Sequence, residues 1–154
     1  MSLTPETAVR YEVRDNVAVL TIDFPPVNAL GAPMRDGTML RLDQALANPQ
    51  VQAIVLIGAN DRFVAGADIS EFGKPRKGVD FFDIQDKMEN SLKPIVCAID
   101  GHALGGGLDR EDQRQDVILV LGRIFRASNG AGRIPQPLFD RFVGVVGHRV
   151  PDER

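Results

Sequence analysis

Near its start the chain has two stretches rich in β-branched residues, the second of them almost continuously apolar. These stretches, Val9–Arg14 and Val17–Phe24, are separated by the pair Asp15 and Asn16. Two such runs on either side of turn-forming residues are typical of a β-hairpin. The pattern therefore predicts two antiparallel strands, which a pair of prolines ends.

Helical spacing of apolar residues follows the prolines. It predicts an amphipathic helix from about Pro33 to Ala47, weakened slightly by Gly37, and a second helix over Val79–Leu92. A short helix is expected to begin near Asp68. The expected inner face of the first helix consists of Met34, Met39, Leu42 and Leu46.

Two continuous apolar runs are too short for helices of ordinary length. Val51–Ile57 and Pro94–Ile99 are therefore predicted to be strands buried on both faces, and Gly58–Gly66 a loop between elements. Strands and helices then alternate along the chain. This order predicts an α/β fold.

Composition and charge exclude several classes of protein. The 154 residues suffice for one domain with a real core, and 44% hydrophobic and 25% charged residues are ordinary for a globular protein. A net charge of -3 gives no basic surface for nucleic acid, and no apolar run is long enough to cross a membrane. We therefore expect a cytoplasmic protein with neither a nucleic-acid nor a membrane partner.

The few cysteines and histidines limit redox and metal chemistry. Cys97 is the single cysteine, so no internal disulfide can form, and its apolar neighbours favour a packing role over a reactive thiol. His102 and His148 are too isolated to suggest a metal site. No metal is expected.

Two loops at strand ends have side chains small enough for a ligand to reach the backbone. One contains Ala65, Gly66 and Ala67, and the other is Gly105–Gly107. Backbone N–H groups at the start of a helix converge there, and a pair of them can act as an oxyanion hole. Paired donors of this kind stabilise the charge that develops on a carbonyl oxygen.

The clustered glycines have several alternative explanations. Clustered glycines can simply allow a strand and a helix to pack closely. A dinucleotide fingerprint fails because Arg110 stands where its third glycine belongs, and no Lys-Ser or Lys-Thr pair follows Gly106 as a Walker loop requires. No GxSxG element is present for a serine hydrolase. Binding of an acyl group by paired amides remains the best chemical interpretation, and an unrelated nucleotide-binding α/β protein remains an alternative if the motifs are accidental.

Three segments carry a family resemblance through their order and spacing. They read PPVNAL at 25–30, FVAGADISEF at 63–72 and KPIVCAIDGHALGGGL at 93–108. This order resembles the crotonase family of enoyl-CoA hydratases and isomerases over about residues 17–108, and more narrowly the hydratase part of multifunctional fatty-acid β-oxidation enzymes. The resemblance implies a crotonase-like core of ββα units wound into a spiral.

The resemblance also implies a substrate and a set of site residues. An acyl-CoA thioester would place its carbonyl between the N–H groups of Ala67 and Gly106, with coenzyme A entering as part of the substrate and no separate cofactor. The proposed substrate-binding residues are Asn28, Ala29, Leu30, Ala65, Asp68, Ile69, Ser70 and Gly105. For Asp68 an N-cap of the short helix is the preferred role.

The carboxylates of the reaction are the weak part of the resemblance. Hydration of an enoyl thioester needs a carboxylate to activate water and an acid to protonate the α-carbon. The family usually supplies two glutamates. Asp109 stands at the first position and is one methylene shorter, whereas residues 117–132, where the second is expected, contain no acidic residue.

The residues from 109 to 154 differ in character from those before them. Asp109–Asp116 has eight consecutive polar residues where the family has a buried apolar helix, and all eight basic residues of 109–154 are arginine. Such a shift is typical of out-of-frame translation of a GC-rich gene. The predicted organisation is a truncated crotonase-like core over 1–108 and a divergent tail, frameshifted or refolded, over 109–154.

Two functions of different class follow. The first is an enoyl-CoA hydratase or isomerase, a lyase or isomerase of fatty-acid metabolism that stabilises a thioester enolate in a backbone oxyanion hole. The second is a catalytically inactive crotonase-like protein that at most binds CoA. If the full fold is present, the family resemblance implies a trimer-based homo-oligomer.

Overall fold

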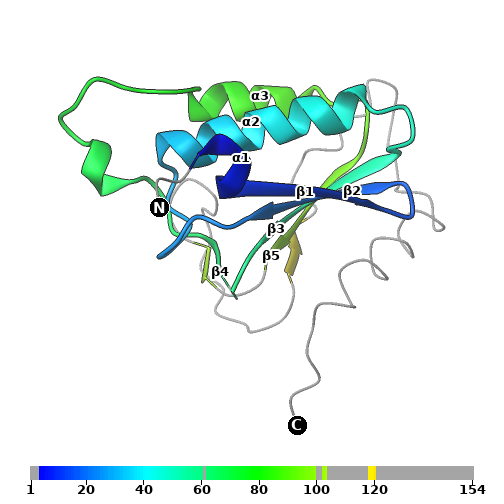
Figure 1. The fold of residues 1–154 in the computed structure, drawn as a ribbon, viewed down its shortest axis with the longest axis horizontal. Helices are drawn as coiled ribbons and strands as arrows, with labels where there is room; N and C mark the ends of the chain where they lie inside the picture. Colours follow the sequence, from blue (N-terminus) through cyan, green and yellow to red (C-terminus); the bar gives the residue numbers. More distant parts are fainter. Residues whose placement is uncertain (1–3, 61, 100–101, 104–117, 121–154) are drawn as a thin grey trace, which may run out of the picture.

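A five-stranded sheet with two helices on one face makes up the body of the protein (Figure 1). The computed structural model describes residues 4–60, 62–99, 102–103 and 118–120. The strand order is β1-β2-β3-β5-β7, and a second sheet contains only β4 and β6. This mixture of sheet and covering helices is the α/β arrangement predicted from the sequence.

The predicted hairpin is present as β1 (Val9–Arg14) and β2 (Val17–Ile22), paired antiparallel. Asp15 and Asn16 both have positive φ, at 47° and 64°. A two-residue turn of this kind matches the right-handed twist of the strands it joins, and Asp and Asn tolerate it better than most residues. The residues of β2 are all buried, which makes it a central strand.

The first long helix, α2 (Ala32–Ala47), agrees closely with the predicted segment. Of its expected inner face, Met34 and Leu42 are buried, and Met39 and Leu46 pack against the core at its edge. The C-terminal end of α2 is closed by Lys93, whose Nζ donates to the carbonyls of Ala45 at 2.8 Å and Asn48 at 2.7 Å. A lysine there satisfies carbonyls that the helix itself leaves free.

Gly37 has a role that helix propensity does not reveal. The one-turn helix α1 (Pro5–Ala8) lies against α2 at this point (Figure 1). A Cβ on Gly37 would lie 2.4 Å from the carbonyl oxygen of Pro5 and 3.1 Å from Cγ2 of Val9. The glycine therefore permits the close approach of the N-terminal segment, which the sequence analysis did not anticipate.

The two apolar runs form parallel strands beside β2. Strand β3 (Ala53–Gly58) pairs with β2, and β5 (Ile95–Ile99) pairs with β3, both in parallel register. The antiparallel β7 (Ile118–Val120) borders β5, so three residues of the region predicted to be a divergent tail join the main sheet. The helix expected after Gly107 lies outside the described residues.

The predicted loop from Gly58 to Gly66 was partly wrong, because it contains the strand β4 (Arg62–Val64). A Cβ on Gly58 would lie 1.7 Å from the carbonyl oxygen of Arg62, so the chain can double back only at a glycine. Strand β4 pairs in parallel with β6 (His102–Ala103). Three residues carry too weak a periodic signal to be recognised in the sequence.

The helix α3 (Phe81–Glu89) is shorter than the predicted Val79–Leu92. Asp80 begins it as an N-cap, with its carboxylate accepting from the Phe82 amide at 3.1 Å. The 3₁₀ turn η1 (Ile69–Glu71) is the short helix expected near Asp68. No helix in the described part of the chain is long and apolar enough to span a membrane.

Both faces of the main sheet are buried, as predicted for its parallel strands. The larger apolar cluster joins one face to the helices and includes Leu20, Ile22, Leu42, Ile54, Ile84 and Ile95. The smaller cluster occupies the opposite face and contains Val17, Val19, Ala53, Val55, Ile57, Val96 and Ala98. The strands are thus fixed from both sides, which holds their ends in a defined arrangement.

Replacing Gly37 with alanine should destabilise the protein, although alanine is the better helix former. The added methyl group would overlap backbone atoms, and overpacking of this kind typically costs about 1–3 kcal/mol. Denaturant unfolding followed by circular dichroism measures the change. Leu40→Ala, on the exposed side of the same helix, is the control and should have a small effect; a Gly37→Ala protein at least as stable as the wild type would contradict the close contact with Pro5.

Cys97 should be unreactive in the folded protein. Its side chain is partly buried against the core, and burial raises the pKa of its thiol to about 11. This pKa is above the value of about 8.5 for a free thiol, so the folded state favours the protonated thiol. The protonated thiol therefore contributes to the stability of the fold. That contribution should be complete below the pKa of the thiol in the unfolded state. It should disappear as the pH rises through the pKa of the thiol in the folded state.

The measurement is the rate of reaction with a thiol reagent in the native state and in denaturant. Slow native reaction and fast denatured reaction are expected, and the stability difference between wild type and Cys97→Ala should shift against the wild type at alkaline pH. Equal reaction rates in the two states would show that the thiol is accessible.

Candidate functional site

The loop after β2 is fixed by Asn28. Its backbone has a φ of 56°, and its side chain is buried, with 4% exposed. Oδ1 accepts from the Phe24 amide at 2.8 Å, and Nδ2 donates to the Arg62 carbonyl at 2.7 Å. Its side chain thereby joins this loop to β4, and the sequence-based assignment of Asn28 to substrate binding stays a prediction.

The loops that contain Leu30 and Ala67 lie side by side. Leu30 and Ala67 form a parallel bridge, and the Leu30 amide donates to the Gly66 carbonyl at 2.8 Å. The Ala65 amide donates to the Asn28 carbonyl at 3.4 Å, a longer contact in the same pairing. Two of the three segments on which the family resemblance rests therefore meet in space.

The bridge leaves the Ala67 amide pointing away from Leu30. In a parallel bridge one residue makes both hydrogen bonds to the neighbours of its partner. Here that residue is Leu30, because its amide bonds to Gly66 rather than to Ala67. Ala67 is exposed, and among the described residues no carbonyl accepts from its N–H.

Asp68 begins the turn that follows. Its carboxylate accepts from the Ser70 amide at 2.9 Å, which makes it the N-cap of η1 and confirms the preferred prediction. A Cβ on Gly31 would lie 2.8 Å from Oδ2 of Asp68, so the carboxylate also lies close to the first loop. Ser70 and Ile69 are exposed, Ile69 by 80%.

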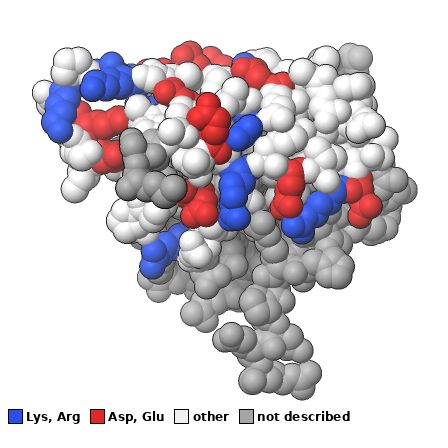
Figure 2. All heavy atoms as spheres, viewed as in Figure 1, with Lys and Arg blue, Asp and Glu red and all other residues white. Residues whose placement is uncertain are grey.

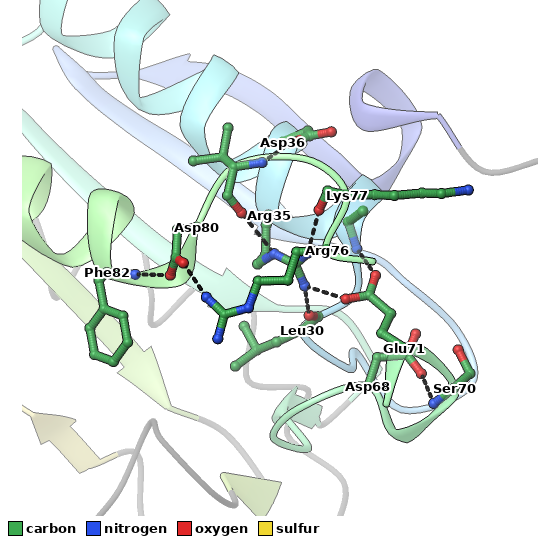
Figure 3. Close-up of polar contacts among 12 residues, drawn as sticks. Leu30, Arg35, Asp36, Asp68, Ser70, Glu71, Arg76, Lys77, Asp80 and Phe82 are labelled. Carbon is green, nitrogen blue, oxygen red and sulfur yellow. Dashed lines mark hydrogen bonds and ion pairs between the residues drawn. The ribbon is translucent and has the colours of Figure 1, made fainter. Parts of the chain in front are cut away.

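Arg35 connects the segments around the site, as Figure 3 shows. Its side chain is only 9% exposed. Nε donates to the Val79 carbonyl at 2.9 Å, and Nη2 to the Lys77 carbonyl at 2.7 Å. Nη1 donates to Glu71 Oε2 at 2.8 Å and also to the Leu30 carbonyl.

Glu71 completes this network. Its second carboxylate oxygen, Oε1, accepts from the amide of Ala32 at 2.7 Å, at the first turn of α2. A carboxylate near a helix N-terminus is favourable because it satisfies a free amide and interacts with the helix dipole. Arg35 and Glu71 together thus join η1 to α2 and to the loop after β2.

Arg35 and Glu71 were not among the residues predicted from the sequence. The signal for Arg35 was its spacing: it lies four residues before Met39 and seven before Leu42, on the predicted inner face of the helix. A charged residue on such a face needs partners. Those partners come from distant loops, so their identity was not readable from the sequence.

Each of the two small-residue loops follows, in the sequence, one strand of the second sheet. Strands β4 and β6 are parallel, with Val64 opposite Ala103. Ala67 comes three residues after Val64, and Gly106 comes three residues after Ala103. Gly105, Gly106 and Asp109, all predicted site residues, lie outside the described residues.

Charges around the site are mixed. Lys and Arg alternate with Asp and Glu over the face in Figure 2, without a large area of one sign. In the loop between η1 and α3, Arg76 pairs with Asp80. Among the described residues no group of three or more His, Cys, Asp or Glu side chains is arranged to hold a metal ion.

The sequence is similar to one described family and to several curated proteins. A sequence model of the family described as Enoyl-CoA hydratase/isomerase matches residues 12–110. The peroxisomal bifunctional enzyme of Danio rerio is 45% identical over 101 residues, which are 65% of this chain and 14% of that protein. The peroxisomal fatty acid beta-oxidation multifunctional protein AIM1 of Arabidopsis thaliana is 43% identical over 116 residues, 70% of this chain and 16% of that protein.

Solved structures confirm the crotonase-like α/β fold. A carnitinyl-CoA dehydratase from Mycobacterium avium 104 has a TM-score of 0.57 and 34% identity, covering 65% of this chain and 42% of that one. An enoyl-CoA hydratase/isomerase from Xanthobacter autotrophicus Py2 has a TM-score of 0.53 and 26% identity, covering 61% and 39%. The chain therefore spans about a seventh of these curated relatives and about two fifths of these structures.

Substitution of Asn28 should separate its two structural contributions. Asn28→Gly keeps the positive φ but loses both side-chain hydrogen bonds, and each buried group left unpaired costs about 1–3 kcal/mol. Asn28→Ala loses the same bonds and adds about 1–2 kcal/mol of backbone strain. Denaturant unfolding measures the free energy of unfolding, which should decrease from the wild type to Asn28→Gly to Asn28→Ala. Equal stability of the wild type and Asn28→Gly would mean that the side chain contributes nothing.

Proposed function

Because the chain belongs to the enoyl-CoA hydratase/isomerase family, we propose that it binds an acyl-CoA thioester and stabilises the enolate in a backbone oxyanion hole. The two donors are the N–H groups of Ala67 and Gly106. The substrate belongs to fatty-acid β-oxidation, as the names of the relatives indicate for those proteins. Coenzyme A is part of the substrate, and no separate cofactor is required.

The parallel pairing of β4 and β6 supports this proposal best. Parallel neighbours lie about 4.8 Å apart and run in the same direction. From the paired positions Val64 and Ala103, three residues lead to Ala67 and three lead to Gly106. This equal spacing along the chain, counted from one pair of adjacent parallel strands, is the reason to propose that the two amides bind the same oxygen atom.

The second support is that no carbonyl among the described residues accepts from the Ala67 amide. A donor useful to a substrate must not be satisfied within the protein. The bridge to Leu30 uses the carbonyl of Gly66 and leaves the Ala67 N–H directed away. The thioester oxygen would gain this hydrogen bond, which strengthens as the oxygen becomes negative in the enolate.

The chemical step adds water across the double bond of a 2-enoyl thioester. The hydroxyl group joins the β-carbon, the electron pair of the double bond moves toward the thioester carbonyl, and a proton then joins the α-carbon. In this proposal Asp109 takes the proton from water, solvent supplies the proton that joins the α-carbon, and Asp109 then returns its own proton to solvent. Its side chain is one methylene shorter than glutamate, and a displacement of about 1 Å can reduce a positioned reaction about 100-fold.

The absence of a second acidic residue favours a second candidate function. Residues 117–132 contain no acidic side chain for the proton delivery that the family assigns to its second glutamate. A protein that retains the thioester site without that group would bind acyl-CoA and turn it over poorly or not at all. This is the inactive alternative, and it shares the binding site with the first proposal.

Location and assembly are proposed more broadly. The relatives are named as peroxisomal proteins, whereas the sequence led us to expect a cytoplasmic one, and that expectation stays a prediction. We propose a trimer-based homo-oligomer, as the family resemblance implied. Native mass spectrometry would reveal it, and a monomer at micromolar concentration would contradict it.

Hydration of crotonyl-CoA, followed by the loss of absorbance of its conjugated double bond, tests the main proposal. We expect turnover above the uncatalysed rate and a loss of about 100-fold or more in Ala67→Pro, which removes the N–H donor. Ala67→Gly keeps the donor and is the matched control, with circular dichroism to verify folding. If Ala67→Pro and Ala67→Gly have equal rates, the amide is not a catalytic donor.

Calorimetry with butyryl-CoA distinguishes the two candidate functions. Binding without turnover of crotonyl-CoA would support the inactive alternative and reject hydratase activity for this chain. A robust activity that Asp109→Ala abolishes would eliminate the alternative. Absence of both binding and turnover would contradict both functions.

A further inference from the structure

The two neighbours of Ala67 are each connected to Arg35. On one side, Gly66 accepts from the Leu30 amide at 2.8 Å, and the Leu30 carbonyl accepts from Nη1 of Arg35. On the other side, the Asp68 carbonyl accepts from the Glu71 amide at 3.1 Å, and the Glu71 carboxylate pairs with the same Nη1 at 2.8 Å. Ala67 thus lies between two backbone segments that one guanidinium nitrogen joins.

We propose that Arg35 and Glu71 are positioning residues that set the direction of the Ala67 amide in the oxyanion hole. Neither belongs to the site predicted from the sequence. Their role rests on the proposed function, since it concerns the same amide donor. Arg35 does not touch substrate in this proposal, because its side chain is buried and four of its five N–H groups bond to Leu30, Glu71, Lys77 and Val79.

The chemistry of the guanidinium suits this role. Arginine presents N–H donors in a planar, rigid arrangement, whereas lysine offers one rotatable ammonium group. Here the plane contacts three carbonyls and one carboxylate from separate segments (Figure 3). A lysine at the same position can keep the charge but cannot bond to all four acceptors at once.

The loop before α3 supports the arrangement from the other side. Asp36 follows Arg35 in α2, and its Oδ1 accepts from the Val79 amide at 2.7 Å. Gly78 has a φ of 70°, and a Cβ there would lie 2.5 Å from the same oxygen. Two consecutive side chains of one helix therefore hold this loop, and the loop supplies two of the carbonyls that fix the guanidinium.

The position of the donor matters for the rate because a hydrogen bond loses strength steeply as its angle departs from linear. A thioester oxygen that becomes negative gains most from a donor already aimed at it. Loosening Arg35 would leave the amide present but poorly directed. The loss should therefore fall on kcat, with a smaller change in KM for an acyl-CoA held by many other contacts.

The experiment combines hydrogen exchange, infrared spectroscopy and kinetics on Arg35→Gln, Arg35→Lys and Glu71→Gln. Arg41→Gln is the matched control. Arg41 lies on the same helix and also donates to two backbone carbonyls, Val9 at 3.0 Å and Glu6 at 3.1 Å, but it contacts the N-terminal segment. Arg41→Gln should lower the stability of the N-terminal segment without affecting the loops at the site.

We expect Arg35→Gln to accelerate exchange of the Leu30, Ala32 and Glu71 amides about tenfold or more, a local opening that Arg41→Gln should not produce. The carbonyl band of bound butyryl-CoA, lowered in frequency by the wild type, should be lowered less by Arg35→Gln. Its kcat should fall about 10- to 100-fold. Arg35→Lys and Glu71→Gln should have exchange rates, carbonyl bands and kcat values between those of the wild type and Arg35→Gln.

Faster exchange in Arg35→Gln with an unchanged carbonyl band and unchanged kcat would overturn the positioning role and leave a purely structural one. Unchanged exchange would overturn it as well. A wild type that leaves the carbonyl band unmoved would refute the oxyanion hole itself, and the exchange data would still decide whether Arg35 holds the loops beside Ala67.

Discussion

The buried guanidinium of Arg35 is the constraint on which the arrangement of the loops depends. A charge removed from water costs several kcal/mol unless it is paired and hydrogen-bonded, and Arg35 meets this requirement only when three segments are in place. The loop after β2, the turn η1 and the loop before α3 each provide at least one acceptor. Because no one of them satisfies the guanidinium alone, the three conformations are coupled. Arg35 makes the inner face of α2 difficult to bury. Because its charge needs these partners, it also determines how the three irregular segments pack around it.

The sheet supplies the other half of the arrangement. In α/β folds, loops at the carboxyl ends of parallel strands lie at a common edge, and ligands bind there. The small sheet of β4 and β6 is a parallel pair in which Val64 lies opposite Ala103, and in the sequence each strand is followed by one of the small-residue loops. Gly58 allows β4 to turn back over the end of β3, and Asn28 ties that strand to the loop after β2. The main sheet therefore carries the pair of strands rather than the site directly.

How far the sequence could predict these features depended on the range of the interactions involved. The hairpin, α2 and the two parallel strands were predictable because hydrophobic periodicity and turn chemistry are local, and the N-cap role of Asp68 follows from a residue and its next two neighbours. Strand β4 was not predictable because three residues hold no period. Gly37 was read as a weak helix residue, whereas its value lies in a contact with Pro5. Of the candidate site, the sequence predicted that the loops at Leu30 and Ala67 are important, but their pairing and the Arg35–Glu71 link between them join residues more than thirty positions apart.

The distribution of hydrogen bonds explains why a backbone donor can remain available at such a place. Irregular loops normally satisfy their amides and carbonyls with one another. Around Ala67 side chains take much of that role: Asn28 bonds to an amide and a carbonyl, Asp68 and Glu71 accept from amides, and Arg35 donates to three carbonyls. Each of these side chains holds backbone in place without using the Ala67 N–H. A loop stabilised mainly by its own backbone pairs would have to open before it could offer a donor, whereas a loop held by side chains can present one while remaining ordered. Gly66 also contributes to this loop: its φ of 93° turns the chain where a residue with a side chain would be strained.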